Sequence, residues 1–173
     1  MERHIQVHMK NNGFTLLELM VSISLAVILL GIGIPSLGSL LKDSNVEYET
    51  ERLLKHLRFA RNQAISDQQT VTACLVNGSD ECVDKQPVQL LVFIDDNDNS
   101  KLDNGENELS RTSAVSADAT LSSTRPRVLF APDGTSIGTN MTIRVCISEE
   151  PRIDLAIAQS GRSSRTETTT ICP

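Results

Sequence analysis

The sequence predicts an α+β protein in which a long N-terminal helix packs on a C-terminal antiparallel β-sheet domain. Residues 14–41 are almost wholly apolar, and an amphipathic segment follows them. After residue 67, short β-branched segments alternate with turn clusters. Aromatic residues make up 3% of the 173-residue chain, so we expect an aliphatic core. The formal charge of −6 disfavours general coating of nucleic acid, although it does not exclude a local basic patch.

The apolar segment 14–41 contains one charged residue, Glu18. As a helix it would be about 42 Å long, enough to cross a hydrocarbon core of about 30 Å. Lys10 precedes it, as is typical of a cytoplasmic flank. A carboxylate at membrane depth needs a partner. If the chain were cut between Gly13 and Phe14, the new α-amine would lie one helical turn before Glu18.

The segment Gly31-Ile32-Gly33-Ile34-Pro35 interrupts this apolar run. Pro35 removes a backbone donor and clashes with the preceding turn, and the glycines add backbone freedom. We therefore expect a kink or a locally melted segment at Pro35.

The sequence Gly13-Phe14-Thr15-Leu16-Leu17-Glu18 resembles the processing motif of type IV pilins and type II secretion pseudopilins, and Pro35 falls where these proteins usually have a proline. The resemblance implies a leader over residues 1–13 that a prepilin peptidase removes, and an N-methylated Phe14. It also implies that Glu18 pairs with a neighbour's N-terminus in a helical filament built on an inner-membrane assembly platform. The alternative is an unprocessed single-pass anchor. Met9 is a second candidate start.

Residues 42–67 are predicted to continue the helix in amphipathic form. Leu53, Leu57, Ala60 and Ala64 form one apolar stripe that should pack on a sheet. Acidic residues precede basic ones along this segment, which suits the helix dipole. The basic residues form a ridge that would face either acidic residues of a neighbouring subunit or water; they are Arg52, Lys55, Arg58 and Arg61. The segment 57–65 resembles the GspH/FimT branch of the pilins.

Residues 68–173 are predicted to form a periplasmic β-rich domain. The expected strands are Thr70–Leu75, Val88–Ile94, Arg127–Phe130, Met141–Ser148 and Asp154–Gln159. Turn clusters separate them, and short strands at this spacing favour an antiparallel sheet covered by the helix.

The four cysteines, Cys74, Cys82, Cys146 and Cys172, all follow the apolar segment. An even number in a translocated domain predicts two disulfides in an oxidising compartment. Three connectivities are possible. We favour Cys74–Cys82, which closes a short loop, and Cys146–Cys172, which would tie down the C-terminal tail. Zinc is disfavoured because there is no C-x-x-C and the leader holds every histidine except one.

Residues 95–106 match a calcium-loop template in part, with Asp95, Asn97, Asn99 and Glu106 as candidate ligands. Ser100 stands where the template requires glycine, and the preceding segment is predicted as a strand instead of a helix. The alternative is a long polar β-connection.

The segment Gly161-Arg162-Ser163-Ser164-Arg165 is similar to the Gly-Arg-x-Arg motif implicated in DNA binding by DNA-uptake pilins of the FimT type. The spacing here is one residue longer, so Arg162 matches and Arg165 does so only loosely. Arginines on a mobile tail would bind DNA phosphates weakly and in a salt-dependent manner. The alternative is a solvated loop after the last strand.

No catalytic constellation or cofactor motif is present in the sequence, and His56 lies among charged residues of the helix. We therefore expect a structural subunit that works by assembly with other pilins or pseudopilins, and no enzyme. The GspH/FimT resemblance implies a minor pilin at or near the tip of a type IV pilus that primes assembly, with double-stranded DNA as a possible ligand. The alternative is a GspH-like minor pseudopilin of a type II secretion system.

Overall fold

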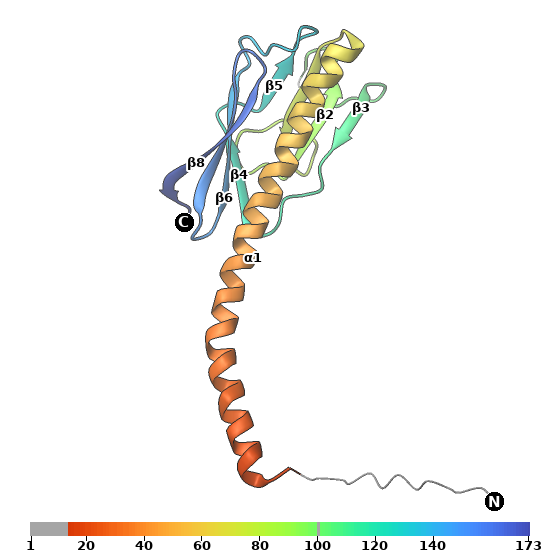
Figure 1. The fold of residues 1–173 in the computed structure, drawn as a ribbon. Coiled ribbons are helices and arrows are strands. Elements are labelled where there is room, and N and C mark those ends of the chain that lie inside the picture. Colours follow the sequence, from red (N-terminus) through yellow and green to blue (C-terminus); the bar gives the residue numbers. More distant parts are fainter. Residues whose placement is uncertain (1–13, 100) are drawn as a thin grey trace, which may run out of the picture. The chain divides into compact units, whose positions relative to one another are not determined.

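The structure is a computed structural model that describes residues 14–99 and 101–173, without the side chains of residues 32–41 and 43. It has the expected α+β fold, with one helix followed by eight strands in the described residues (Figure 1). The elements are α1 (Leu16–Asp67), β1 (Val71–Val76), β2 (Gln89–Ile94), β3 (Asn107–Arg111), β4 (Ala119–Ser123), β5 (Arg127–Phe130), β6 (Met141–Ile147), β7 (Pro151–Ile157) and β8 (Ser163–Ile171).

The chain divides into two compact units, Met1–Leu40 and Leu41–Pro173. The predicted leader, including Gly13, lies outside the described residues. Helix α1 begins at Leu16 and is helical through Pro35, so the melted segment predicted there is not found, and a bend at Pro35 stays a prediction. Among the described residues, no helix is both long and apolar enough to cross a membrane.

The second unit contains two antiparallel four-stranded sheets, with the strand orders β3-β2-β1-β5 and β4-β6-β7-β8. In the first sheet, Cys74 of β1 lies opposite Leu91 of β2 and Arg127 of β5. In the second sheet, Arg144 of β6 lies opposite Ser122 of β4 and Asp154 of β7. The edges of the second sheet are therefore β4 and β8.

The apolar stripe predicted for residues 42–67 is confirmed, because Leu53, Leu57, Ala60 and Ala64 are completely buried. They belong to one hydrophobic cluster with residues from strands of both sheets. A second cluster on the other face of the first sheet contains Cys74, Val76, Leu91 and Phe93. Strand β1 is consequently buried along its whole length, which explains why its sequence does not alternate cleanly between apolar and polar residues.

The sequence predicted one antiparallel sheet, whereas the structure has two, and three of the strands were missed. Strands β3, β4 and β8 are short of apolar residues, and all three lie at sheet edges. The C-terminal segment predicted as a mobile tail or a solvated loop forms β8, which pairs with β7 over most of its length. Its threonines were the available signal, because β-branched residues favour strands.

Candidate functional site

The described part of the processing motif lies at the exposed start of α1. The ring of Phe14 is 78% exposed, and Phe14 and Thr15 precede the first helical residue. The Thr15 hydroxyl oxygen accepts a hydrogen bond from the backbone N–H of Glu18, with an N to Oγ1 distance of 3.2 Å. Thr15 is therefore the N-cap of the helix, and Glu18 occupies the third helical position. This helix-starting signal, T-x-x-E, was present in the sequence but was not used.

Glu18 is exposed and forms no ion pair within the described residues. Every large apolar side chain between Phe14 and Leu30 is also more than half exposed. A continuous apolar surface of this length needs cover from lipid or from other protein. The N-terminal part of α1 thus presents an uncovered apolar surface that carries one carboxylate.

Both favoured disulfides are formed. Cys74 bonds to Cys82 and Cys146 bonds to Cys172, each pair with a Cα–Cα distance of 5.5 Å. The second bond fixes the segment that follows β8 to β6 in the centre of the second sheet. No described cysteine is free to bind a metal ion.

The candidate calcium loop forms hydrogen bonds with its own backbone. Glu106 accepts hydrogen bonds from the N–H groups of Asp96 and Asp103, while Asp95 and Asn97 both accept from the N–H of Asn99. Asp95 also forms an ion pair of 2.9 Å with Arg127. In the described part of the chain, no three His, Cys, Asp or Glu side chains could together hold a metal ion. The hydrogen bonds within the loop are those expected of a polar β-connection, and calcium binding stays a prediction.

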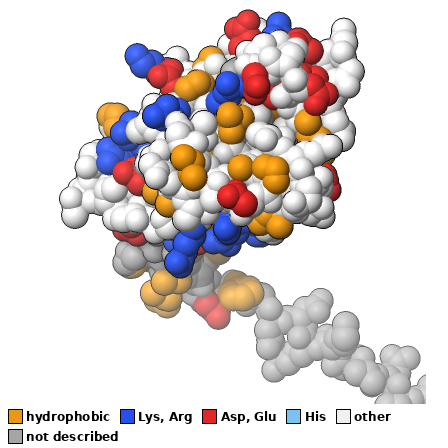
Figure 2. All heavy atoms as spheres, turned by 90° about the horizontal axis from the view of Figure 1, so that it is seen from above, with side chains coloured by type: hydrophobic (Ala, Val, Ile, Leu, Met, Phe, Trp, Pro, Cys, Tyr) orange, Lys and Arg blue, Asp and Glu red, His pale blue; other side chains and the backbone are white. Residues whose placement is uncertain are grey.

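The same loop lowers the pKa of one carboxyl group. The side-chain amides of Asn97 and Asn99 donate hydrogen bonds of 2.9 and 2.6 Å to Asp103, and these bonds hold the pKa of Asp103 below its ordinary value. Figure 2 shows a group of acidic side chains at the upper right of this face, with others scattered over the rest of it.

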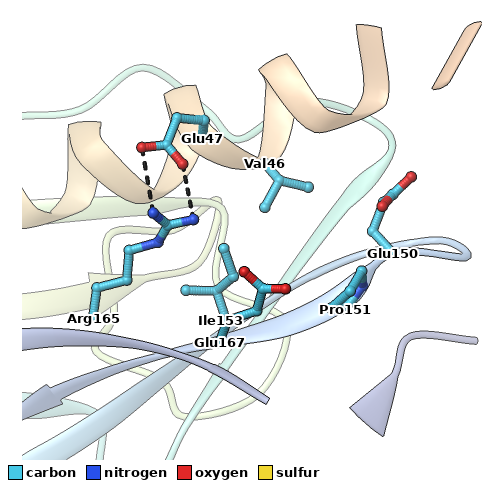
Figure 3. A pocket seen from close by; sticks show the side chains of 7 residues that line it. All are labelled: Val46, Glu47, Glu150, Pro151, Ile153, Arg165 and Glu167. Atoms are coloured by element: carbon cyan, nitrogen blue, oxygen red, sulfur yellow. Dashed lines mark hydrogen bonds and ion pairs between the residues drawn. The ribbon is translucent and has the colours of Figure 1, made fainter. Parts of the chain in front are cut away.

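The two candidate DNA-binding arginines lie in different environments. Arg162 is exposed in the turn before β8. Arg165 lies on β8 and forms an ion pair of 2.8 Å with Glu47 of α1 (Figure 3). The small pocket beside this pair, about 250 Å³ in volume, also contains the carboxylates of Glu150 and Glu167. Arg165 therefore lies among acidic groups, which disfavours a phosphate contact there.

A buried ion pair was missed from the sequence. Glu49 and Arg52 of α1 form a hydrogen-bonded ion pair, and their side chains are only 3% and 10% exposed. Glu49 also accepts a hydrogen bond of 3.0 Å from the N–H of Ser116, while Arg52 donates to the hydroxyl of Ser113. The pair therefore fastens the loop between β3 and β4 to α1. Burial of two charges is favourable only with such additional hydrogen bonds.

The lone histidine beyond the leader, His56, is half-buried, with its Nδ1 atom 2.8 Å from the backbone carbonyl of Arg52 one turn earlier. The imidazole of His56 therefore contacts the preceding turn of its own helix.

Two family models match the sequence. The family described as type II transport protein GspH matches residues 49–161. The prokaryotic N-terminal methylation motif matches residues 8–34. The comparison with curated proteins gave no match.

Three solved structures have a similar fold. The type IV minor pilin FimU of Pseudomonas aeruginosa gives a TM-score of 0.53 at 18% identity over 77% of this chain and 96% of its own. A second crystal form gives 0.51 at 18% identity, with coverages of 74% and 98%. The minor pseudopilin EpsH of the Vibrio cholerae type 2 secretion system gives 0.51 at 11% identity, with coverages of 71% and 97%. At these identities the similarity establishes the fold.

Proposed function

Because this chain belongs to the GspH family of minor pilins and pseudopilins and carries an N-terminal methylation motif, we propose that it is a minor subunit of a type IV pilus that is incorporated at or near the tip and primes assembly. Members of this family are structural subunits that assemble with other pilins, and they are not enzymes. The alternative is a minor pseudopilin of a type II secretion system. A type IV minor pilin and a minor pseudopilin both occur among the solved structures with this fold.

In this proposal the N-terminal segment is processed before assembly. A prepilin peptidase cuts between Gly13 and Phe14, and the new N-terminus at Phe14 is methylated. The chain is held in the inner membrane by residues 14–41 with its C-terminal domain in the periplasm, where the two disulfides form. The match of the methylation motif to residues 8–34 supports this part.

Glu18 is the proposed assembly residue. Its carboxylate is exposed within an uncovered apolar helix surface, where neighbouring subunits or lipid would bury it. A buried carboxylate needs a cationic partner, and the α-amine of a neighbour's Phe14 provides one. The platform in the inner membrane would then add the subunit to the filament.

DNA uptake through Arg162 is a separate hypothesis that we do not include in the proposal. Arg165 forms its ion pair with Glu47, so only Arg162 of the two arginines is available to a phosphate. One exposed arginine gives weak binding at physiological salt.

The joint match of the GspH family model and the methylation motif carries the filament-subunit part of the proposal. The choice of the pilus and the priming role are what the experiment tests. The test deletes the gene in its host and complements it with the parent chain or with Glu18→Val. Surface pili should be lost on deletion and restored by the parent only, while secretion of type II substrates stays normal. Glu18→Val should still be cut at Phe14, as checked by mass spectrometry of the N-terminus. Lost secretion with normal pili would instead favour the pseudopilin alternative.

A further inference from the structure

The outer face of the second sheet contains a hollow of about 740 Å³ that the sequence did not reveal. Its lining includes three basic side chains, those of Lys85, Arg144 and Arg152. The Cys146–Cys172 disulfide and Ile171 supply apolar surface beside them.

Strand alternation places these groups together. Strand β6 buries its alternate residues from Met141 to Ile147 in the core, so Arg144 and Cys146 lie on the opposite face. The register sets Arg144 opposite Ser122, and Lys85 forms an isolated β-bridge with Ser122. The chain thus brings Lys85 and Arg144 to the same part of the sheet face.

The disulfide forms one wall of the hollow. It links Cys172 to Cys146, and the backbone of Cys172 exchanges hydrogen bonds with Glu149 and Glu150. This arrangement holds Ile171 beside the hollow with 57% of its surface exposed. The hollow therefore places an exposed apolar side chain and a disulfide next to cationic groups.

The cations are unequally neutralised. Arg152 donates two hydrogen bonds, of 2.9 and 3.2 Å, to Asp154. Within the described residues, the side chains of Lys85 and Arg144 form no ion pair or hydrogen bond. The carboxylate of Asp154, which Arg152 holds, lies on the strand opposite Arg144, so the three cations of the hollow face one carboxylate. The remaining positive charge beside an apolar surface complements a ligand that combines carboxylate and aliphatic groups.

We propose that this hollow binds an acidic, partly aliphatic peptide segment of a different subunit in the same filament. This proposal rests on the function proposed above, because it assumes assembly with other subunits. A nucleic acid would leave the surface of Ile171 and the disulfide without an apolar partner. The acidic loop of a second copy is a poor candidate for this segment, because the carboxylates of Asp95, Asp103 and Glu106 already accept hydrogen bonds within the loop.

The test uses the full chain in its host, with a photo-crosslinking amino acid in place of Gln86, which lines the hollow and is exposed. Crosslinked peptides are identified by mass spectrometry from sheared filaments. We expect a peptide from another subunit that contains Asp or Glu beside aliphatic residues. Lys85→Glu/Arg144→Glu should lower the crosslink yield by about tenfold or more.

The matched control is Lys101→Glu/Arg125→Glu, which makes the same charge change at two exposed cations outside the hollow. Its yield should equal that of the parent. Unchanged yield in the Lys85/Arg144 variant would overturn the proposal. A crosslink from the parent chain to nucleic acid, to a second copy of this chain or to a peptide without acidic residues would also overturn the proposal. This outcome does not depend on whether the variants fold. Absence of the parent chain from filaments would overturn the proposed function as well, whereas its presence without the expected crosslink would overturn the hollow alone.

Discussion

The backbone of Gly161 lies against the carbonyl oxygen of Gly134. A Cβ atom at position 161 would be only 1.9 Å from that oxygen, and Gly161 also has a φ of +73°. The same carbonyl accepts a hydrogen bond of 2.9 Å from Nε of Arg61, so helix α1 is fastened to both turns at this point. The glycine of the Gly-Arg pair therefore has a structural reason to be present, independent of any DNA contact.

Gly161→Ala should lower the free energy of unfolding by about 2–4 kcal/mol, because the methyl group forces the two turns apart and strains the backbone. Gly138→Ala is the matched control. Gly138 has a φ of +78° but nothing within 4 Å of its added Cβ, so this variant should lose only about 1–2 kcal/mol. Denaturant titration of the detergent-solubilised full chain measures both. Equal losses would show that the contact with Gly134 does not matter.

Glu49→Ala should lower the free energy of unfolding by about 3–5 kcal/mol, because it leaves the buried guanidinium of Arg52 without its counter-ion and the N–H of Ser116 without its acceptor. Glu51→Ala, two residues later on the same helix, removes a carboxylate with no ion pair in the described structure and should cost less than about 1 kcal/mol. Denaturant titration compares them. A loss for Glu49→Ala no larger than the Glu51→Ala loss would contradict the role given to the buried pair.

The two disulfides should contribute unequally to stability. Cys146–Cys172 spans a sequence separation of 26 and Cys74–Cys82 one of 8, and the constraint on the unfolded chain grows with the length of the closed loop. Cys146→Ala/Cys172→Ala should therefore cost about 3.5 kcal/mol, and Cys74→Ala/Cys82→Ala about 2.5 kcal/mol. Thermal unfolding with and without reductant gives the comparison. A variant unaffected by its lost bond would refute the contribution of that bond.

The carboxyl group of Asp103 should titrate at a pKa below its ordinary value, because Asn97 and Asn99 donate hydrogen bonds to its charged form. Since the pKa is lower in the folded chain than in the unfolded one, these bonds stabilise the fold above the unfolded pKa. That contribution is lost as the pH falls through the folded pKa. Asn97→Ala and Asn99→Ala should each raise the pKa of Asp103, as measured by NMR titration.

Asp133 serves as the internal control for this titration. The N–H and hydroxyl of Thr135 lower its pKa, and neither asparagine contributes to this shift. Its titration should not change in the two variants. An Asp103 pKa that is unchanged by both substitutions would refute the hydrogen-bond explanation.

The helix stripe and the Cys74–Cys82 disulfide could be predicted because each follows from local spacing. Leu53, Leu57, Ala60 and Ala64 repeat with the helical period and are buried as expected. Cys74 and Cys82 are close in sequence, so a short loop is the simplest closure. Strands β1, β2, β5, β6 and β7 contain apolar or β-branched runs, and their predicted ranges lie within a few residues of the observed ones.

The remaining features depend on contacts between distant segments, which a single sequence does not specify. Strand β8 is polar, and its extended form follows from pairing with β7. Arg165 was predicted as a mobile phosphate ligand, but the fold places it next to Glu47, more than a hundred residues earlier in the chain. The cationic hollow likewise combines side chains from separate strands and from the segment before β2.

Strand β8 has a neighbour on one side only, so roughly every second backbone amide along its nine residues faces water in the isolated domain. Those outward amides should exchange with solvent deuterium far faster than their inward neighbours, which bond to β7. The strand thereby carries its own reference signal. Where another segment pairs with this edge, the deuterium exchange of the outward amides slows, while that of the inward amides serves as the standard. The ratio of the two exchange rates therefore reports contact at the edge without any added label.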